Sequence, residues 1–190
     1  MLNTPIRIHI FGASGSGTTT LGKALWKELD IPVYDYDDYY WETTDPPFTT
    51  KVERNERHMH LLNDIGDRDN YIISGHYGLE VKELDKNLTH AIFLSTPNEL
   101  RMKRLKARER QNYGSRIDIG GDMYESNIAF LEWAKGYESN SKLSRNLEEH
   151  KERIKLLSCP VLQLDGSNEL KDKVATAMDF FNNKCRGLYD

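Results

Sequence analysis

The chain has 190 residues, of which 38% are hydrophobic and 29% charged, a composition typical of a folded globular protein and not of a disordered one. The formal net charge of −4 argues against a general nucleic-acid coat protein, since such proteins are basic. No apolar run approaches the roughly 18 residues that a membrane span needs, and no signal-peptide pattern opens the sequence. We therefore expect one cytoplasmic domain over residues 1–190, with no membrane contact.

Short apolar runs of strand length alternate along the chain with segments of helical periodicity. Strands are expected at residues 6–11, 32–36, 71–74, 91–94 and 161–164. Helices are expected at residues 18–30, 50–66, 97–111, 122–138, 141–157 and 168–183. This alternation predicts an α/β fold with a five-stranded parallel sheet sandwiched by helices. Because ligands bind at the carboxyl ends of parallel strands, functional residues are expected directly after each strand.

A glycine-rich stretch connects the first expected strand to the first expected helix. It fits the phosphate-binding loop G-x-x-x-x-G-K-[ST] except at the lysine, where Thr18 stands. Its glycines let backbone N–H groups converge on an anion, and the helix start adds the positive end of its dipole. A glycine-rich turn without a ligand is the alternative, which the strand-to-helix context disfavours. The residues expected to hold nucleotide phosphates are Gly12, Ala13, Ser14, Gly15, Ser16, Gly17, Thr18, Thr19 and Thr20.

The threonine at position 18 removes a positive charge from the loop. The lysine of the motif neutralises the outer phosphates, whereas Thr18 offers its backbone N–H without charge. Lys23 is a poor substitute because it lies five residues further along the helix, on a different face. The missing charge must come from elsewhere, or phosphoryl transfer is slow. Thr19 stands where the hydroxyl that ligates Mg²⁺ belongs.

Two carboxylates follow the second expected strand. Asp35 and Asp37 alternate along an extended segment, so their side chains point to the same side. Asp35 is expected to hold Mg²⁺, and Asp37 to orient an acceptor hydroxyl or to accept its proton. An acidic turn that merely leaves the strand is the alternative. Residues 39–41 (Tyr-Tyr-Trp) form either a wall for a flat substrate or part of the core.

The third expected strand is followed by Ser74-Gly75-His76-Tyr77-Gly78. His76 either contacts a substrate or satisfies the turn, and the second interpretation is favoured because histidine is often a satisfied polar group. This strand carries no acidic residue at its end, so a metal would depend on Thr19 and Asp35.

A basic stretch follows the fourth expected strand. Arg104 and Arg108 share a helical face, and Arg116 lies in a glycine-bearing segment. A mobile lid over about residues 109–122 would bring Arg116 to a polyphosphate, and this cluster could supply the charge missing at position 18. A solvated basic helix and a nucleic-acid contact are the alternatives. Asp122 and Glu125 have the spacing of a capping box and predict a helix start.

In order along nearly the whole chain, these motifs resemble those of the small P-loop kinases of the adenylate kinase and shikimate kinase group. The branch they are most similar to is the topology-modulation-type, adenylate-kinase-related one, although those families carry lysine at the position of Thr18. The resemblance implies that Arg104 and Arg108 lie over the adenine and contact phosphate. It also implies an adenine-side loop at Gly166 and Ser167.

By the same resemblance, the strand-two motif of shikimate kinase implies a metal role for Asp35 and an acceptor-hydroxyl role for Asp37. The substrate-side arginines of nucleotide kinases have no secure match, and Arg54 and Arg57 are the candidates.

The leading hypothesis is an ATP-dependent kinase that uses Mg²⁺ and acts on a small molecule such as a nucleotide, a nucleoside or a hydroxylated metabolite. Asp37, Arg108 and Arg116 are its expected catalytic residues. The first alternative is a nucleotide-binding regulator with weak or no kinase activity. The second is a nucleic-acid-associated protein that uses the basic stretch. The acceptor, the choice of ATP or GTP and the oligomeric state stay open.

Overall fold

The fold is built on one parallel sheet. The structure, a computed structural model, describes residues 5–79 and 81–186. Its strands, all parallel, are β1 (Arg7–Gly12), β2 (Val33–Asp35), β3 (Tyr71–Ser74), β4 (His90–Ser95) and β5 (Val161–Asp165). They lie in the order β2-β3-β1-β4-β5. The expected α/β fold with a five-stranded parallel sheet is therefore confirmed.

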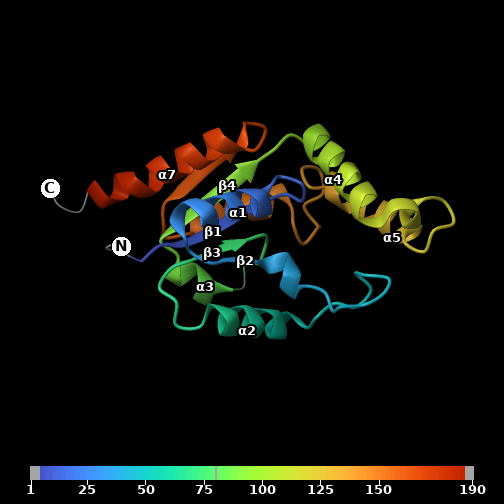
Figure 1. Cartoon of the computed structure of the whole chain (residues 1–190), viewed down its shortest axis with the longest axis horizontal. Helices are drawn as coiled ribbons and strands as arrows, with labels where there is room; N and C mark the ends of the chain where they lie inside the picture. Colours follow the sequence, from blue (N-terminus) through green and yellow to red (C-terminus); the bar gives the residue numbers. More distant parts are fainter. Residues whose placement is uncertain (1–4, 80, 187–190) are drawn as a thin grey trace.

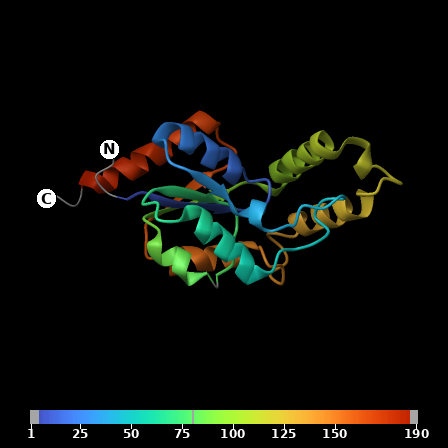
Figure 2. The same cartoon turned by 60° about the horizontal axis from the view of Figure 1, so that its bottom comes forward.

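Helices cover both faces of this sheet. The helices are α1 (Thr18–Leu29), α2 (Arg54–Ile65), α3 (Lys82–Asn87), α4 (Asn98–Tyr113), α5 (Tyr124–Lys135), α6 (Leu147–Leu156) and α7 (Leu170–Arg186). Helices α1 and α7 lie on one face, and α2, α3 and α6 lie on the other (Figure 2). Six of the seven were expected, whereas α3 was missed because six residues are too few to show a helical period. None of the helices in these described ranges is long and apolar enough to span a membrane.

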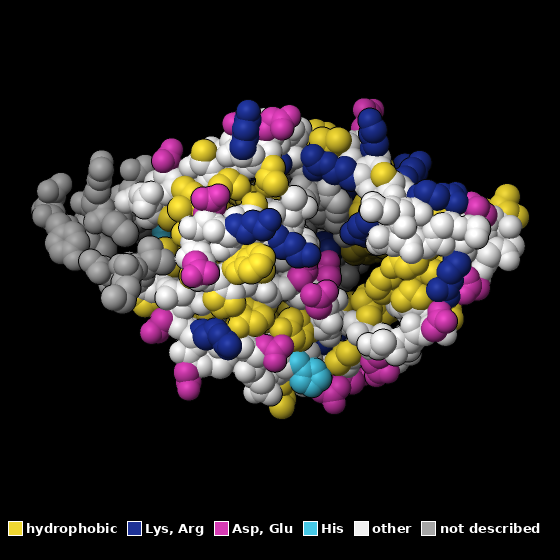
Figure 3. Space-filling model, in the orientation of Figure 1, with side chains coloured by type: hydrophobic (Ala, Val, Ile, Leu, Met, Phe, Trp, Pro, Cys, Tyr) yellow, Lys and Arg dark blue, Asp and Glu magenta, His cyan; other side chains and the backbone are white. Residues whose placement is uncertain are grey.

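Helices α4 and α5 lie side by side and extend beyond the carboxyl end of the sheet (Figure 1). The expected lid, residues 109–122, comprises the end of α4, the short 3₁₀ helix η2 (Gly114–Ile117) and the turn before α5. Figure 3 shows the surface hollowed between this pair and the body of the molecule, with hydrophobic side chains gathered in the hollow. The β2 carboxylates and the phosphate loop belong to the same end of the sheet.

Several helices begin later than expected, and α2 begins at Arg54 and not at residue 50. The Asp122 side chain does not cap α5, which begins at Tyr124, because it accepts hydrogen bonds from Arg116 instead. Helix α6 begins at Leu147 and not at residue 141, and the side chain of Asn146 accepts the backbone N–H of Glu149 at 2.9 Å. Residues 140–146 are therefore an irregular connection at the carboxyl end of the sheet.

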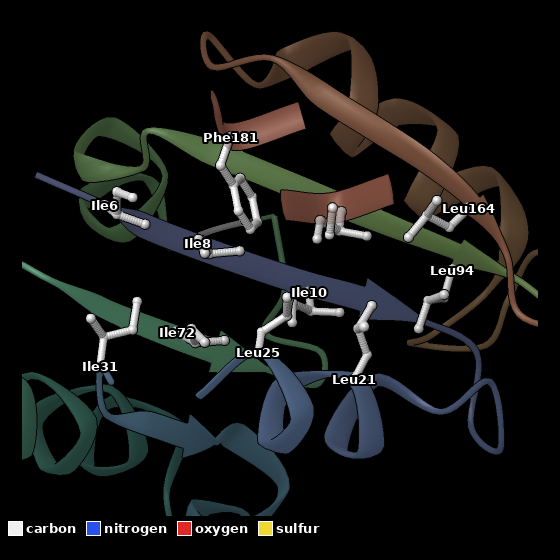
Figure 4. Packing of buried hydrophobic residues seen from close by; sticks show 12 residues of the cluster. Ile6, Ile8, Ile10, Leu21, Leu25, Ile31, Ile72, Leu94, Leu164 and Phe181 are labelled. Atoms are coloured by element: carbon white, nitrogen blue, oxygen red, sulfur yellow. The ribbon is translucent and has the colours of Figure 1, made fainter. Parts of the chain in front are cut away.

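The main core lies between β1 and the α1–α7 face (Figure 4). Ile8 and Ile10 of β1 meet Leu21 and Leu25 of α1, and all four side chains are fully buried. A side chain at Gly22 would come within 3.1 Å of Val33 Cγ2, so this glycine lets α1 approach β2 closely. This packing holds the start of α1 at the carboxyl end of β1, which is where the phosphate loop needs it.

Candidate active site

The glycine-rich loop between β1 and α1 has the backbone conformation that its sequence implies. Gly15 and Gly17 have φ values of 79° and 103°, in the left-handed region that glycine adopts without strain. A Cβ at Gly15 would also lie 2.9 Å from the Arg101 carbonyl oxygen. The first helical hydrogen bond runs from the Leu21 N–H to the Gly17 carbonyl. The backbone N–H groups of Thr18, Thr19 and Thr20 therefore come before the first hydrogen bond of α1. Such groups can bind an anion.

The Thr19 hydroxyl and the Asp35 carboxylate meet at the mouth of this loop. Thr19 Oγ1 donates to Asp35 Oδ2 at 2.5 Å, and Asp35 Oδ1 accepts the Asp37 N–H at 3.1 Å. Burial raises the pKa of Asp35 above its ordinary value, against the lowering effect of the Thr19 hydrogen bond.

The two groups fit the hydroxyl and carboxylate part of a Mg²⁺ site whose other ligands are phosphate oxygens and water. Within the described residues, no cluster of three or more His, Cys, Asp or Glu side chains would hold a metal by itself. An ion at this position would therefore depend on the phosphates of a nucleotide.

Asp37 lies two residues further on, in the 3₁₀ helix η1 (Tyr36–Tyr39), and its side chain is 54% exposed. Its Oδ1 accepts from Arg145 Nη2 at 2.8 Å. The same guanidinium donates through Nη1 to Ser14 Oγ of the phosphate loop at 3.1 Å. Arg145 therefore joins the loop to the expected acceptor carboxylate, a contact that sequence reasoning missed.

The three arginines expected at the phosphates have different surroundings. Arg104 contacts the phosphate loop, since its guanidinium donates to the carbonyls of Gly15, Ser16 and Gly166 at 3.0–3.5 Å. The Arg108 guanidinium pairs with Glu109 and lies 5.7 Å from the ring centre of Phe130.

Arg116 pairs with Asp122 and, across the hollow, with Asp45 of the segment after β2 at 2.7 Å. Arg110 likewise pairs with Asp118. This neutralisation of the basic stretch argues against its use as a nucleic-acid surface.

A cavity of about 330 Å³ opens beside the loop on the β5 side. Its lining residues are Ser16, Gly17, Thr20, Arg104, Ser167, Asn168, Glu169, Leu170 and Lys173. Lys173, which sequence reasoning missed, is buried and donates to the carbonyls of Gly166 and Asn168 at 3.1 and 2.8 Å. Burial lowers the pKa of this ammonium.

Position 166, in the loop after β5, has no room for a side chain. A Cβ on Gly166 would overlap Thr96 Oγ1 and lie 3.0 Å from the Ser16 carbonyl oxygen. The loop after β5 therefore lies directly against the phosphate loop, and Ser167 of this loop lines the cavity.

A second cavity, of about 800 Å³, opens between the ends of β4 and β5 and residues 135–139. It is the larger of the two, but it touches the phosphate loop only at Ala13 and contains neither Thr19 nor the β2 carboxylates. The phosphate loop, the Thr19–Asp35 pair and the smaller cavity therefore form the candidate site.

Aromatic side chains join the segment after β2 to the end of α4. Trp41 contacts Phe48 with ring centres 5.6 Å apart, and Phe48 contacts Tyr113 of α4 at 6.1 Å. Tyr39, in contrast, packs against the cluster around Tyr36 and donates to Asp64. Of the two alternatives for residues 39–41, core packing holds for Tyr39, whereas Trp41 contacts Phe48, which in turn contacts α4.

The substrate-side arginine candidate Arg57 belongs to the same region. Its guanidinium lies 3.8 Å from the ring centre of Tyr40 and donates to the Val52 carbonyl at 2.5 Å.

A chain of buried side chains lies below residues 144–146. The Tyr137 hydroxyl contacts His150 Nδ1 at 2.7 Å, His150 Nε2 contacts His76 Nδ1 at 3.1 Å, and His76 Nε2 contacts the Ser144 carbonyl at 3.2 Å. One set of neutral tautomers satisfies every link, with each donor followed by an acceptor. His76 is thus a satisfied polar group, as favoured from the sequence.

Three buried histidines predict that the protein loses stability in acid. Burial and the nearby Arg145 and Arg153 lower the pKa of His150 to about 3, and burial lowers the pKa of His9 and His76 well below 6.5. Below about pH 6.5 these imidazoles are protonated in the unfolded chain and stay neutral in the folded chain. The free energy of unfolding therefore falls as pH falls.

We expect a loss of about 1.4 kcal/mol per pH unit for each histidine. Urea unfolding at pH 8, 6.5 and 5 measures this loss. A free energy of unfolding that stays constant across that range would contradict the assignment.

Comparisons with known proteins agree with this geometry. A family model described as an AAA domain (AAA_18) matches residues 8–128. The chain is 36% identical over 176 residues to the uncharacterized protein YqaC of Bacillus subtilis, which covers 93% of this chain and 97% of YqaC. It is 30% identical over 116 residues to shikimate kinase of Bacteroides fragilis, or 56% of this chain and 65% of that enzyme.

Among solved structures, shikimate kinase from Acinetobacter baumannii in complex with shikimate superposes with a TM-score of 0.57 at 16% identity. The superposition covers 96% of this chain and 95% of that one, and at this identity it establishes the fold alone. The matched family model runs from β1 through the lid segment into α5, which is well over half of the sequence. The chain therefore belongs to this AAA-domain family and has the fold of the small P-loop kinases.

Proposed function

We propose that the protein is an ATP-dependent phosphotransferase that acts on a small molecule. The observation that carries the proposal is the hydrogen-bonded pair of Thr19 and Asp35 at the mouth of a glycine-rich loop, with Asp37 two residues further on. A hydroxyl and a carboxylate for Mg²⁺, beside a second carboxylate for an acceptor, are the parts that phosphoryl transfer to a hydroxyl requires.

The residues of the site divide the work. The backbone of residues 12–20 would hold the phosphates, and Thr19 and Asp35 would hold Mg²⁺, which neutralises charge on the outer phosphates when it is bound. Asp37 would orient the acceptor hydroxyl and take its proton. The cavity lined by Arg104, Ser167 and Lys173 would receive the base, beside Gly166.

The lid arginines require a change of partner. Arg108 and Arg116 are proposed to clamp the transferring group when the lid segment closes. Since Arg108 now pairs with Glu109, and Arg116 with Asp45 and Asp122, each would exchange a carboxylate for phosphate.

The acceptor would enter the hollow beside Asp37. Trp41, Phe48 and Tyr113 offer ring faces and edges there, so planar compounds belong in any acceptor screen. The similarity to shikimate kinase adds hydroxylated acids to that screen.

A panel of nucleosides, nucleotides, sugars and hydroxy acids tests the proposal by coupled ADP release with ATP and Mg²⁺. At least one compound is expected to raise ADP release well above the rate without acceptor, and the new phosphoester is then identified by mass spectrometry. ADP release that no compound accelerates would count against a kinase.

A nucleotide-binding regulator is the second candidate, and the uncharged Thr18 favours it. In that case Thr18→Lys raises hydrolysis while Asp37→Ala has little effect. A kinase shows the opposite sensitivity at Asp37.

A further inference from the structure

The loop lacks its lysine, and the basic stretch of α4 does not replace it in this structure. Arg101 is fully buried and paired with Glu138, and Arg116 is paired with acids of the lid and of the segment after β2. Arg104 does lie against the loop, but its Nη1 and Nη2 already donate to the carbonyls of Gly15, Ser16 and Gly166. Arg108 and Arg116 would reach the phosphates only after they leave their present carboxylate partners, so a cation that already lies at the loop is sought on another element.

Arg145, in the connection between α5 and α6, lies at the required place. Its Nη1 donates to Ser14 Oγ inside the phosphate loop and its Nη2 donates to Asp37 Oδ1. The side chain is only 11% exposed, and the guanidinium lies 5.7 Å from the ring centre of Trp133. A group transferred from the loop to an acceptor held by Asp37 would pass this guanidinium.

The backbone on both sides of Arg145 is fixed. The Ser144 carbonyl accepts from His76 Nε2, which continues through His150 to Tyr137. On the other side, Asn146 caps α6 and its Nδ2 donates to the Leu143 carbonyl at 2.7 Å. An arginine whose neighbours on both sides are held by partly buried hydrogen bonds is pre-organised for a defined contact.

We propose that Arg145 supplies the phosphate-facing positive charge that the lysine supplies in other phosphate-binding loops. The proposal rests on the proposed kinase function. With ATP bound, Nη1 exchanges Ser14 Oγ for an oxygen of the γ-phosphate, while Nη2 keeps Asp37 directed at the acceptor. A planar guanidinium makes both contacts at once because its donors form a fixed fork.

The group-transfer step is then balanced. The acceptor oxygen forms a bond to the γ-phosphorus as the bond from that phosphorus to the β-phosphate oxygen breaks, and the electron pair of that bond leaves with ADP. The acceptor proton passes to Asp37 and then to solvent. Arg145 changes no covalent bond and offsets negative charge on the transferring group.

The ratio of ATP affinity to ADP affinity tests this role directly, because only ATP carries the γ-phosphate. Isothermal titration of ATP and of ADP, each with Mg²⁺, is carried out on wild type, Arg145→Met and Lys151→Met. Lys151 is a control because it forms an exposed pair with Glu148 on α6. We expect Arg145→Met to weaken ATP about tenfold or more and to leave ADP within about twofold, while the control changes neither.

A comparison of Arg145→Met in wild type and in Thr18→Lys tests whether a lysine at position 18 can replace Arg145. Arg145→Met is expected to lower ATP turnover about 100-fold in wild type and less than about tenfold in Thr18→Lys, because the new lysine serves the same phosphate. Circular dichroism and thermal melting exclude misfolding of the variants. The two losses enter a double-mutant cycle.

Any of the following outcomes would overturn the inference. Equal weakening of ATP and ADP would mean that Arg145 holds the loop structurally. An equal loss of turnover in both backgrounds would mean that Arg145 does not contact the phosphate that a lysine at position 18 contacts. A loss confined to the KM of an acceptor would mean the same. A wild type that binds no ATP with Mg²⁺ would overturn the proposed function together with the inference, whereas a fully active Arg145→Met overturns the inference alone.

Discussion

Replacement of Asp37 by asparagine is expected to lower turnover by about two to four orders of magnitude, since general-base catalysis contributes an effect of that size. The amide keeps the size of the carboxylate and can still accept from Arg145, but it cannot take a proton. The affinity for ATP with Mg²⁺ is expected to stay within about threefold, because the loss is confined to the transition state. Steady-state kinetics with the acceptor found by the ADP-release screen, together with ATP titration, measure both quantities.

Asp38→Asn is the matched control. Asp38 is the next residue of η1 and is exposed, and among the described hydrogen bonds its carboxylate makes no contact with Arg145 or Thr19. Its substitution is expected to leave turnover within about threefold. Equal losses from both variants would show that the acidity of the segment matters and not the position of Asp37.

Replacement of Arg101 by methionine is expected to lower the free energy of unfolding by about 3 kcal/mol, because it removes a fully buried guanidinium that donates to several backbone carbonyls and pairs with Glu138. Arg101 is fully buried and donates twice to the Glu138 carboxylate, at 2.6 and 2.7 Å. It also donates to the Ala134 carbonyl at 3.2 Å. The substitution therefore removes the contacts between α4 and the end of α5. It also leaves the carbonyls of Thr96 and Ala134 without this donor. Urea unfolding at pH 7.5 measures the change.

Arg110→Met, on the same helix, is the comparison. Arg110 and Asp118 form an exposed pair, with both side chains more than half accessible, and such pairs contribute little. The urea midpoint of this variant is expected to stay close to that of wild type. If Arg101→Met unfolds at the same urea concentration as Arg110→Met, the contacts of Arg101 with Glu138 and Ala134 do not hold α4 to α5.

Local patterns made the nucleotide end of the site predictable. The strand, the glycines and the helix from Arg7 to Leu29 are contiguous, and each imposes a pattern of its own on the sequence. The meeting of Thr19 with Asp35 followed from a general rule, since both residues follow strands whose carboxyl ends share one edge of the sheet. Neither step needed knowledge of contacts between distant segments.

The cations of the site were not predictable in the same way. Arg145 lies 108 residues from Asp37 in the sequence, and nothing in its neighbours marks it as part of the site. One local signal was present, since Asn146 and Glu149 have the spacing of a helix N-cap, and this would have moved the start of the expected helix from residue 141 to residue 147. Lys173 was hidden for a related reason, because its burial depends on the turn after β5 and not on the periodicity of α7.

The partners of the lid arginines also depend on tertiary structure. Arg116 was expected at the phosphates, whereas it bridges Asp122 and Asp45, residues on two different segments. A sequence shows that an arginine is available, but the competition between carboxylates and phosphate is decided by which groups the fold brings within reach.

The most direct test of the whole account is isothermal titration of ATP into the wild-type protein with and without Mg²⁺, with GTP as the comparison. We predict saturable binding of ATP that strengthens with Mg²⁺ and loses that strengthening in Thr19→Ala, because the hydroxyl beside Asp35 is part of the proposed metal site. Binding that appears only after Thr18→Lys, or none in either protein, would show that this lysine-free loop does not hold a nucleotide.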